Sequence, residues 1–337
     1  MHEIELKFQI PPEARAAVRS GVATPGAQTT RLRAFYVDTP ELHLARAGMA
    51  LRLRQEGERW VQTFKAPGGD ALRRIEHEVQ LDAAAVAAGP RLDLARHAGN
   101  PAGAALAGAL GDGAAALRVT FETDVSRCHR VMRHAGADIE LALDVGVVRA
   151  GESELALREI EFELVDGPVA GLLDLARHWV EQHGLWLDVR SKAERGHLLA
   201  HRMTVASATL ARPVRAADTR DADLALRRTV EASLDHILPN AAALAAGLAS
   251  DDHLTQARLG VAALHQAFTS LPNQGQARAL TGARTQADAE KSWMRRLGEL
   301  TVQLDSSKHQ SGAALRSATA GALWLELLGY ALADQAR

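Results

Sequence analysis

Residues 2–10, HEIELKFQI, begin the chain with charged and apolar side chains in alternation. Glu3, Glu5 and Lys7 fall on one face of an extended segment, because successive side chains of a strand point to opposite faces. Such a strand buries its apolar face, and its charged face either meets water or lines an enclosed space. The recurrence of this pattern in other strands, with charges of both signs, decides between these two arrangements.

The same alternation recurs in five further segments. They are ALRLR (50–54), WVQTFK (60–65), RIEHEVQL (74–81), ADIELALDVG (137–146) and REIEFELV (158–165). Two architectures fit: a one-sided sheet with solvated ion pairs, or a sheet closed into a barrel whose charged faces point inward. The amphipathic segments 12–22 and 168–185 favour the barrel, because their apolar stripes need a sheet face to cover.

Composition limits the class of protein. A length of 337 residues suits two domains. A formal net charge of -2 provides no basic field for nucleic acid, and 4% aromatic residues provide few stacking platforms. No apolar run approaches the roughly 20 residues of a membrane span, the charged start is unlike a secretory signal, and the single Cys128 fits a reducing compartment. We expect a cytoplasmic protein with no nucleic-acid or membrane partner.

The composition and the hydrophobic pattern of the sequence change along the chain. Residues 1–203 alternate strand-like runs with turn signals, whereas residues 218–337 carry alanine and leucine at helical spacing. Residues 204–217 are small and polar and include a proline, which is typical of a linker. We therefore predict a β-rich first domain and an all-α helical bundle as the second.

A series of short motifs follows in order between residues 2 and 200. They are the ExExK of residues 3–7, YVDTP (36–40), GMALRLR (48–54), TFK (63–65), RIEHE (74–78), FETDVSR (121–127), ELALDVG (140–146), EIEFEL (159–164) and SKAERG (191–196). Together they resemble the CYTH domain of the triphosphate tunnel metalloenzymes. The resemblance implies an α+β fold with a closed eight-stranded antiparallel β-barrel tunnel, covering helices, and a divalent-metal-dependent activity on a triphosphate.

A triphosphate chain carries several negative charges, so cations must surround it. The expected substrate-binding cations are Arg52, Arg54, Lys65, Arg74, Arg127 and Lys192. Carboxylates in the same tunnel would repel phosphate unless Mg²⁺ or Mn²⁺ bridged the two. By similarity to the paired ExE strands of the family, the expected metal ligands are Glu3, Glu5, Glu159 and Glu161, with Glu163 either a ligand or a lining residue of the tunnel mouth.

The catalytic residues expected beside these are Lys7, Glu76, Glu78 and Asp144. The three acids could hold a second metal or orient the attacking water, and cations near the leaving phosphate would stabilise its developing charge. No histidine lies in an HxH or HExxH spacing, so no histidine metal site is expected.

The predicted reaction is hydrolysis of inorganic triphosphate (tripolyphosphate) to pyrophosphate and phosphate. A class IV adenylyl cyclase or a thiamine or nucleoside triphosphatase on the same fold is the alternative, and it needs a pocket for the organic end of its substrate. A non-catalytic polyphosphate-binding module is an alternative of another class, although it would be expected to lack the ExE carboxylates.

The helical half resembles another module. Residues 226–244 and 251–268 resemble the opening helices of the CHAD domain, a polyphosphate-associated module that often follows bacterial CYTH domains. The pattern is partial and degenerate, because Thr255 stands where a histidine is typical and Ala262 where an arginine is typical. With acidic and basic residues nearly balanced in this half, its charge argues against polyphosphate binding. We expect a structural or regulatory role, such as covering the tunnel or joining two copies in a homodimer.

Overall fold

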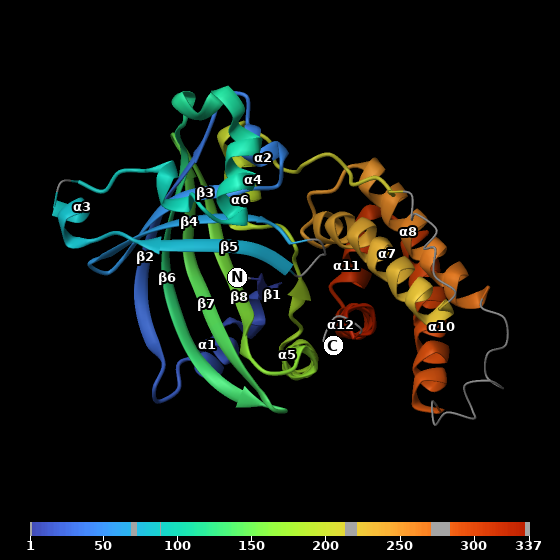
Figure 1. Ribbon diagram of the computed structural model, residues 1–337. Helices are drawn as coiled ribbons and strands as arrows, with labels where there is room; N and C mark the ends of the chain where they lie inside the picture. The colour runs from blue at the N-terminus through green and yellow to red at the C-terminus, as the bar shows by residue number, and fades with distance from the viewer. Residues whose placement is uncertain (1, 69–72, 88, 213–220, 271–283, 334–337) are drawn as a thin grey trace. The chain divides into compact units, whose positions relative to one another are not determined.

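The computed structural model describes residues 2–68, 73–87, 89–212, 221–270 and 284–333 (Figure 1). The chain divides into two compact units: the first comprises residues 1–172 and 190–206, and the second comprises residues 173–189 and 207–337. The domain limits at 203 and 218 remain predictions. Residues 213–217 of the predicted linker and 218–220 of the predicted helical domain lie outside the described residues.

The first unit is built on eight antiparallel strands (Figure 1). They are β1 (His2–Gln9), β2 (Gln28–Asp38), β3 (Ala50–Glu56), β4 (Arg59–Pro67), β5 (Arg73–Gln80), β6 (Arg118–His134), β7 (Ala137–Ala150) and β8 (Ser153–Asp166). Their order is β5-β4-β3-β2-β6-β7-β8-β1, and β1 also pairs with β5, so the sheet closes on itself. Closure confirms the predicted eight-stranded barrel and excludes the one-sided sheet.

Short helices accompany the barrel. They are η1 (Pro12–Ala14), α1 (Arg15–Val22), α2 (His43–Arg46), α3 (Ala83–Ala87), η2 (Leu94–His97), α4 (Pro101–Leu110), η3 (Gly111–Ala116) and α6 (Lys192–Ala200). As predicted for segment 12–22, α1 buries Val18 and Val22 fully and contacts β6 and β7. Leu44 of α2 and Leu106 of α4 pack in one core cluster with Phe64 of β4. Helices therefore cover apolar side chains on the outside of the barrel.

One part of the inner face is apolar, which the alternation of charges did not predict. Tyr36 of β2 and Phe121 of β6 stack with ring centroids 4.4 Å apart, in a core cluster against which α6 packs. Gly196 of α6 lies so close to Phe121 that a Cβ added there would meet its ring at 2.1 Å. Ser191 caps the start of α6 by accepting from the Glu194 amide at 3.0 Å. The helix is thus fixed on the inner face, with Lys192 in its first turn.

Replacing Gly196 by alanine tests this packing. We expect Gly196→Ala to lower the free energy of unfolding by about 2 kcal/mol, because the added methyl group overlaps a buried ring and forces the helix or the ring to move. The matched control is Gly108→Ala in α4, where nothing lies within 4 Å of the added Cβ. The control should leave stability unchanged or raise it slightly. Equal unfolding midpoints for the two variants in urea would contradict this packing.

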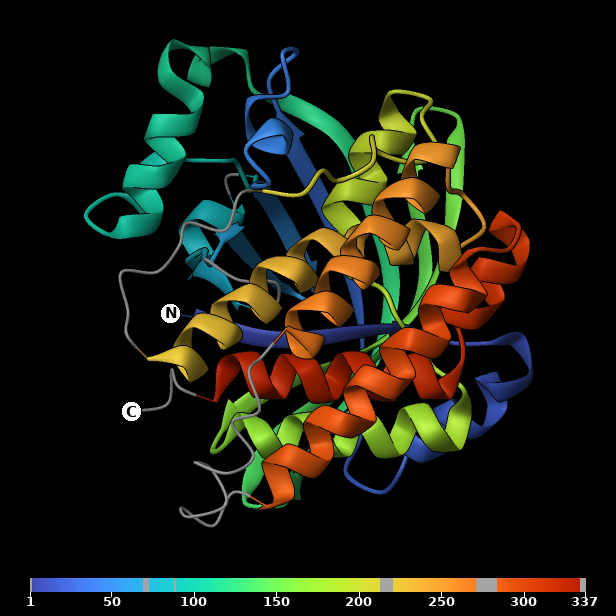
Figure 2. The same ribbon diagram turned by 90° about the vertical axis from the view of Figure 1, so that its right-hand side faces the viewer.

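The second unit is helical. It contains α5 (Val169–His183, from residue 173 on), the short strand β9 (Trp186–Leu187), α7 (Ala222–Ala245), α8 (Asp251–Thr269), α10 (Arg284–Leu304), α11 (Lys308–Leu315) and α12 (Ala318–Leu332). Helices α7, α8 and α10 lie side by side (Figure 2). The helices from α7 onward confirm the predicted helical C-terminal region. Within the described residues, no helix combines the length and the apolar character needed to cross a membrane.

The predicted helix over 168–185 is present as α5. A Cβ at Gly321 of α12 would stand 2.8 Å from Val180, and one at Gly329 would stand 3.1 Å from Leu173. Leu173 and Val180 of the apolar stripe thus lie beside glycines of α12, where the missing side chains allow close approach, whereas the sequence indicates a sheet face as their cover.

Candidate functional site

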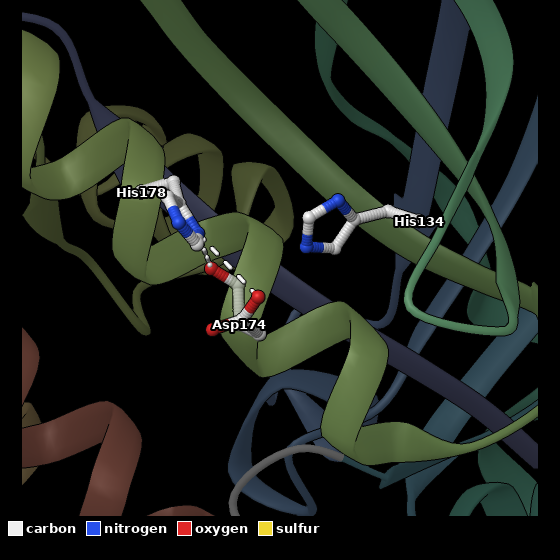
Figure 3. Close-up of side chains that lie close together, drawn as sticks. All are labelled: His134, Asp174 and His178. Carbon is white, nitrogen blue, oxygen red and sulfur yellow. Dashed lines mark hydrogen bonds and ion pairs between the residues drawn. The ribbon is translucent and has the colours of Figure 1, made fainter.

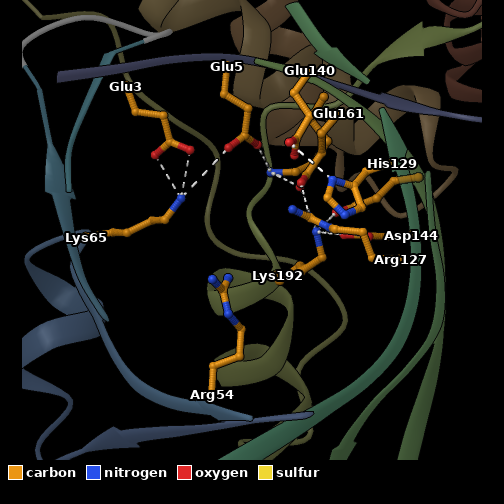
Figure 4. Close-up of polar contacts among 12 residues, drawn as sticks. Glu3, Glu5, Arg54, Lys65, Arg127, His129, Glu140, Asp144, Glu161 and Lys192 are labelled. Atoms are coloured by element: carbon orange, nitrogen blue, oxygen red, sulfur yellow. Dashed lines mark hydrogen bonds and ion pairs between the residues drawn. The ribbon is translucent and has the colours of Figure 1, made fainter. Parts of the chain in front are cut away.

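The charged faces predicted from the alternation lie on the inside of the barrel (Figure 4). The labelled side chains come from strands and a helix that are far apart in the sequence, and they point toward one another in the enclosed space. Two groups of contacts can be distinguished by their balance of charge.

Lys192 of α6 holds three buried carboxylates together. Its Nζ lies 2.8 Å from Asp144 Oδ2, 2.5 Å from Glu159 Oε1 and 2.6 Å from Glu161 Oε1. Ligand oxygens of these three acids lie within 4.8 Å of one another, a spacing that could also hold a metal ion. In this structure the ammonium group offsets part of the charge of the trio.

Two arginines complete this group. Arg127 donates to both oxygens of Asp144 at 2.7 Å and to Glu161 at 2.5 Å, and Arg195 pairs with Glu159. Three cations therefore face three carboxylates. Burial opposes ionisation of Glu161, but Lys192 and Arg127 outweigh it and hold the pKa of this carboxyl well below its ordinary value. We name this group the cation-paired cluster: Arg127, Asp144, Glu159, Glu161, Lys192 and Arg195.

A second group gathers where β1 meets β4, β5 and β8. Lys65 Nζ lies 2.8 Å from Glu3 Oε2, 3.9 Å from Glu5 Oε2 and 3.3 Å from Glu76 Oε2. Lys7 Nζ lies 3.3 Å from Glu5 Oε1 and 3.8 Å from Glu161 Oε1, so it stands between the two groups. We name the second group the acid-rich cluster: Glu3, Glu5, Lys7, Lys65, Glu76 and Glu163.

Negative charge is in excess in the acid-rich cluster, where four carboxylates share two ammonium groups. Burial, followed by the charges of Glu3 and Glu5, raises the pKa of Glu163 to about 8. Burial, followed by the charge of Glu161, raises the pKa of Glu5 as well. An all-oxygen ligand set with uncompensated charge suits a hard divalent cation. The acid-rich cluster thus carries the surplus of acid, whereas the oxygens of Asp144, Glu159 and Glu161 in the cation-paired cluster are the ones that lie within 4.8 Å of one another.

Arg52 and Arg54 of β3 line another side of the barrel. Arg52 Nη1 donates to the Tyr36 hydroxyl at 3.0 Å, and Arg54 pairs with Glu56 and, at 3.2 Å, with Glu78. The Nε atoms of both arginines are buried and have no hydrogen-bond partner among the described residues. Buried donors without acceptors are costly, so an anion that accepts from them would be stabilised.

Some of the site residues predicted from the sequence have few contacts with the two clusters. Arg74 lies opposite Glu3 in the β1–β5 pair, but no hydrogen bond or ion pair links its side chain to either cluster among the described residues. Glu163 lies opposite Glu5 on β1 and Glu140 on β7. Glu78 is 43% exposed at its side chain and stands at the edge of the group.

Four polar residues of the inner face were not assigned from the sequence. Arg195 follows Lys192 by three residues, a spacing that places both on the same side of a helix. Glu56, His129 and Glu140 continue the alternation of residues that were assigned on β3, β6 and β7. Extending the period-2 pattern by one step on β3 and β6, and by two steps on β7, would have found these three.

Arg258 and Arg316 of the second unit donate to main-chain oxygens within that unit. Arg258 donates to the main-chain oxygen of Leu304 at 2.6 Å and to that of Ser306 at 3.0 Å, and Arg316 donates to that of Ala245 at 2.6 Å. These carbonyls lie at or just beyond the ends of α10 and α7, where acceptors lack intrahelical partners. The guanidinium groups therefore satisfy helix ends, which supports a structural use of these arginines.

Figure 3 shows Asp174 and His178 one turn apart on α5. His178 Nδ1 lies 2.7 Å from the main-chain oxygen of Asp174 and 3.5 Å from its Oδ2. Pairs at this spacing are common on helix surfaces. His134, also drawn, ends β6 in the other unit, and no metal site is built on these residues.

The family model of the CYTH domain matches residues 1–197. The chain belongs to the CYTH family. The match covers all eight strands of the barrel and most of α6, so both charged clusters fall within the CYTH domain.

Individual relatives agree with this assignment. An inorganic triphosphatase of Haemophilus influenzae is 29% identical over 212 residues, which cover 59% of this chain and 55% of the relative. The chain thus spans about half the length of that curated relative. Among solved structures, a Hippeastrum protein described as a candidate adenylyl cyclase with dominant triphosphatase activity is 18% identical, with a TM-score of 0.42, and covers 60% of this chain and 96% of its own.

A candidate adenylate cyclase of Bacillus halodurans is 20% identical with a TM-score of 0.37, over 52% of this chain and 89% of its own. The family relationship and the triphosphatase relative support a triphosphatase or a related CYTH enzyme.

The surplus of acid predicts an unusual dependence of stability on pH. The pKa of Glu163 in the fold is about 8, whereas an unfolded glutamate titrates near 4.3. The folded state therefore binds more protons than the unfolded state between these values, and its stability falls as pH rises through this window. In EDTA we expect the free energy of unfolding to fall by on the order of 2 kcal/mol between pH 5 and pH 9, after discounting for partial exposure.

Thermal unfolding between pH 5 and pH 9, in EDTA and in Mn²⁺, measures this effect. Glu163→Gln should flatten the slope in EDTA, because glutamine stays neutral, and Mn²⁺ should restore stability at high pH to the unsubstituted chain. An identical pH slope for the chain and for Glu163→Gln would show that Glu163 does not carry the surplus charge.

Proposed function

We propose that the barrel hydrolyses inorganic triphosphate to pyrophosphate and phosphate with the help of Mg²⁺ or Mn²⁺. The observation that carries the proposal is the presence, on one enclosed face, of an acid-rich cluster beside arginines whose buried donors lack acceptors. Carboxylates in excess suit a metal, and the unpaired Nε donors of Arg52 and Arg54 suit phosphate oxygens. A metal-bound triphosphate contains a divalent cation for the carboxylates and phosphate oxygens for the arginines, so it matches the two features together.

In this proposal Glu3, Glu5 and Glu163 hold the metal. When bound, the metal would neutralise charge on the phosphate oxygens and so lower the barrier to attack by water. Glu161 would join these ligands if Lys192 and Arg127 turned toward phosphate, since these two cations now hold it. Glu159 has both oxygens engaged by Lys192 and Arg195, which favours a role in fixing α6 over metal ligation.

The triphosphate would be bound by Arg52, Arg54, Lys65, Arg127 and Lys192, with Arg74 at the barrel wall. Guanidinium groups can contact two phosphate oxygens at once, whereas the ammonium groups act as point charges. Binding exchanges carboxylate partners for phosphate partners, so the cations are already in place when the substrate enters.

Lys7 is proposed as the residue that stabilises charge on the leaving phosphate. Burial opposes its charged form, but the neighbouring Glu5, Glu159 and Glu161 outweigh burial and raise the pKa of Lys7 above its ordinary value. A lysine held in its charged form is a poor base and a good partner for developing negative charge. Glu76 and Asp144, with Glu78 at the edge, would orient water or support a second metal.

An organic substrate is the second candidate in the same barrel. A base or thiazole ring needs an aromatic or apolar surface to pack on. Tyr36 and Phe121 are the aromatic residues of the inner-face core cluster, and they stack on each other at 3% and 2% exposure. Their faces are therefore used within the fold, which favours an inorganic substrate over adenosine or thiamine triphosphates. Intact carboxylates on β1 and β8 disfavour a non-catalytic polyphosphate-binding module.

We propose a structural or regulatory role for the second unit, with a second copy of this chain as its candidate partner. The arginine contacts to helix ends support this proposal over polyphosphate binding. A cytoplasmic location and the CHAD resemblance stay predictions.

Phosphate release tests the proposed function. The purified chain is incubated with tripolyphosphate, ATP or thiamine triphosphate, each with Mg²⁺, Mn²⁺ or EDTA. We expect tripolyphosphate to be cleaved fastest and only with metal. Glu5→Gln should lower the rate at least about 100-fold, because a metal ligand is lost. Glu58→Gln, at an exposed position of the same unit, is the matched control and should keep full activity. Metal-independent cleavage, or full activity of Glu5→Gln, would contradict the proposal.

A further inference from the structure

A histidine and a glutamate form a pair on the inner face, beside the two clusters. His129 Nδ1 on β6 lies 3.2 Å from Glu140 Oε2 on β7. The two side chains are 26% and 25% exposed, so both remain accessible to a small molecule. Figure 4 shows the imidazole and Arg127 close together, from the same strand. Neither His129 nor Glu140 has a role in the metal and substrate binding proposed above.

The strand register brings His129 into the row of the reacting groups. Across the sheet, His129 lies opposite Ala142, Ala142 opposite Glu161, and Glu161 opposite Lys7. Alanine is the smallest side chain that this row can carry between the imidazole and the carboxylate. Ala142 is itself buried at 3% exposure, so the accessible groups at this end of the row are His129 and Glu140.

The contact with Glu140 turns His129 Nδ1 toward a carboxylate oxygen. An ionised carboxylate only accepts hydrogen bonds, so a neutral His129 donates from Nδ1–H, and Nε2 keeps its lone pair. No hydrogen bond to Nε2 is present among the described residues. An imidazole oriented by a carboxylate, with its second nitrogen free, is the arrangement that general bases use.

We propose that His129 is the general base of triphosphate hydrolysis and that Glu140 is its positioning residue; this inference rests on the proposed function. A water oxygen attacks the terminal phosphorus while one water proton passes to His129 Nε2. The new P–O bond forms as the bridging P–O bond breaks, and the electron pair of that bond stays on pyrophosphate. The imidazolium, stabilised by Glu140, then returns its proton to the leaving pyrophosphate or to solvent.

The surroundings of His129 contain charges of both signs. Its own strand carries the cation Arg127, and β7 carries the acids Glu140 and Asp144. Farther across the sheet, β8 contributes Glu161 and Glu163, and β1 contributes Glu5 and Lys7. On β2 the residue paired with His129 is Gln28, which is uncharged. Acids outnumber cations on this part of the inner face, so the protonated imidazole formed in the step can be stabilised there.

Kinetics as a function of pH test the pair on the full chain with tripolyphosphate and Mn²⁺. We expect His129→Asn to lower kcat about 100-fold with little change in KM, since proton transfer contributes roughly 10² to 10⁴ to such rates. The acidic limb of the kcat profile should disappear in His129→Asn. In Glu140→Gln the limb should move to lower pH, because the imidazolium has lost a stabilising carboxylate.

His178→Asn is the matched control, since it removes a histidine paired with a carboxylate on α5 (Figure 3). It should leave kcat and the pH profile unchanged. Binding of imidotriphosphate, a slowly hydrolysed analogue, should be alike in the chain and in His129→Asn. If His129→Asn does not fold, His129→Gln and Glu140→Gln give the same comparison.

Three results would overturn the inference. A kcat and pH profile of His129→Asn within twofold of the unsubstituted chain would show that the pair is structural. A rise in KM with weaker analogue binding and an unchanged pH profile would make His129 a binding residue. If the unsubstituted chain releases no phosphate, the proposed function itself is wrong. This outcome differs from the other two because it is seen without any substitution.

Discussion

Compensation of buried charge inside the barrel is the constraint on which the rest of the structure depends. Carboxylates from β1, β5, β7 and β8 face one another across a closed sheet, and an isolated buried carboxylate is strongly unfavourable. Lys192, Lys65 and Arg127 each contact two or three of these acids. Since Lys192 comes from α6, the position of this helix on the inner face also helps to balance the buried carboxylates. Gly196 and Phe121 hold the helix where its lysine is needed.

The charges inside the barrel are not fully balanced, and this imbalance is what allows the barrel to bind a charged ligand. The cation-paired cluster is balanced, so it orders β6, β7, β8 and α6 without needing a ligand. The acid-rich cluster is not balanced, and its raised glutamate pKa values are the physical expression of that surplus. A divalent cation would supply the missing positive charge, and its phosphate partner would satisfy the arginines of β3. The surplus carboxylates and the unpaired arginine donors therefore favour a ligand that combines a divalent cation with phosphate groups.

Period-2 alternation predicts the charged and apolar faces of the strands, because it separates the two faces of each strand independently of the rest of the fold. The prediction of a closed barrel rests on the apolar stripes of the covering helices and on the resemblance to the CYTH domain. The sequence predicts neither α6 on the inner face nor the stacked Tyr36 and Phe121, because alternation does not distinguish a charged end of a barrel from an apolar one. Asp138 illustrates another limit: it is in phase with Glu140 and Asp144 in the sequence. A register shift between Asp138 and Ile139 accompanies an exposed pairing of Asp138 with Arg133. Which acids share a cation depends on cross-strand contacts that spacing alone cannot give.

Anomalous diffraction from crystals grown with Mn²⁺ and imidotriphosphate tests the central claim most directly, because it locates the metal without reference to rate. The account predicts an anomalous peak bounded by Glu3, Glu5 and Glu163, with the analogue held by Arg52 and Arg54. A peak centred on Asp144, Glu159 and Glu161, with Lys192 displaced, would contradict the division of the barrel into a balanced cluster and one that needs a metal.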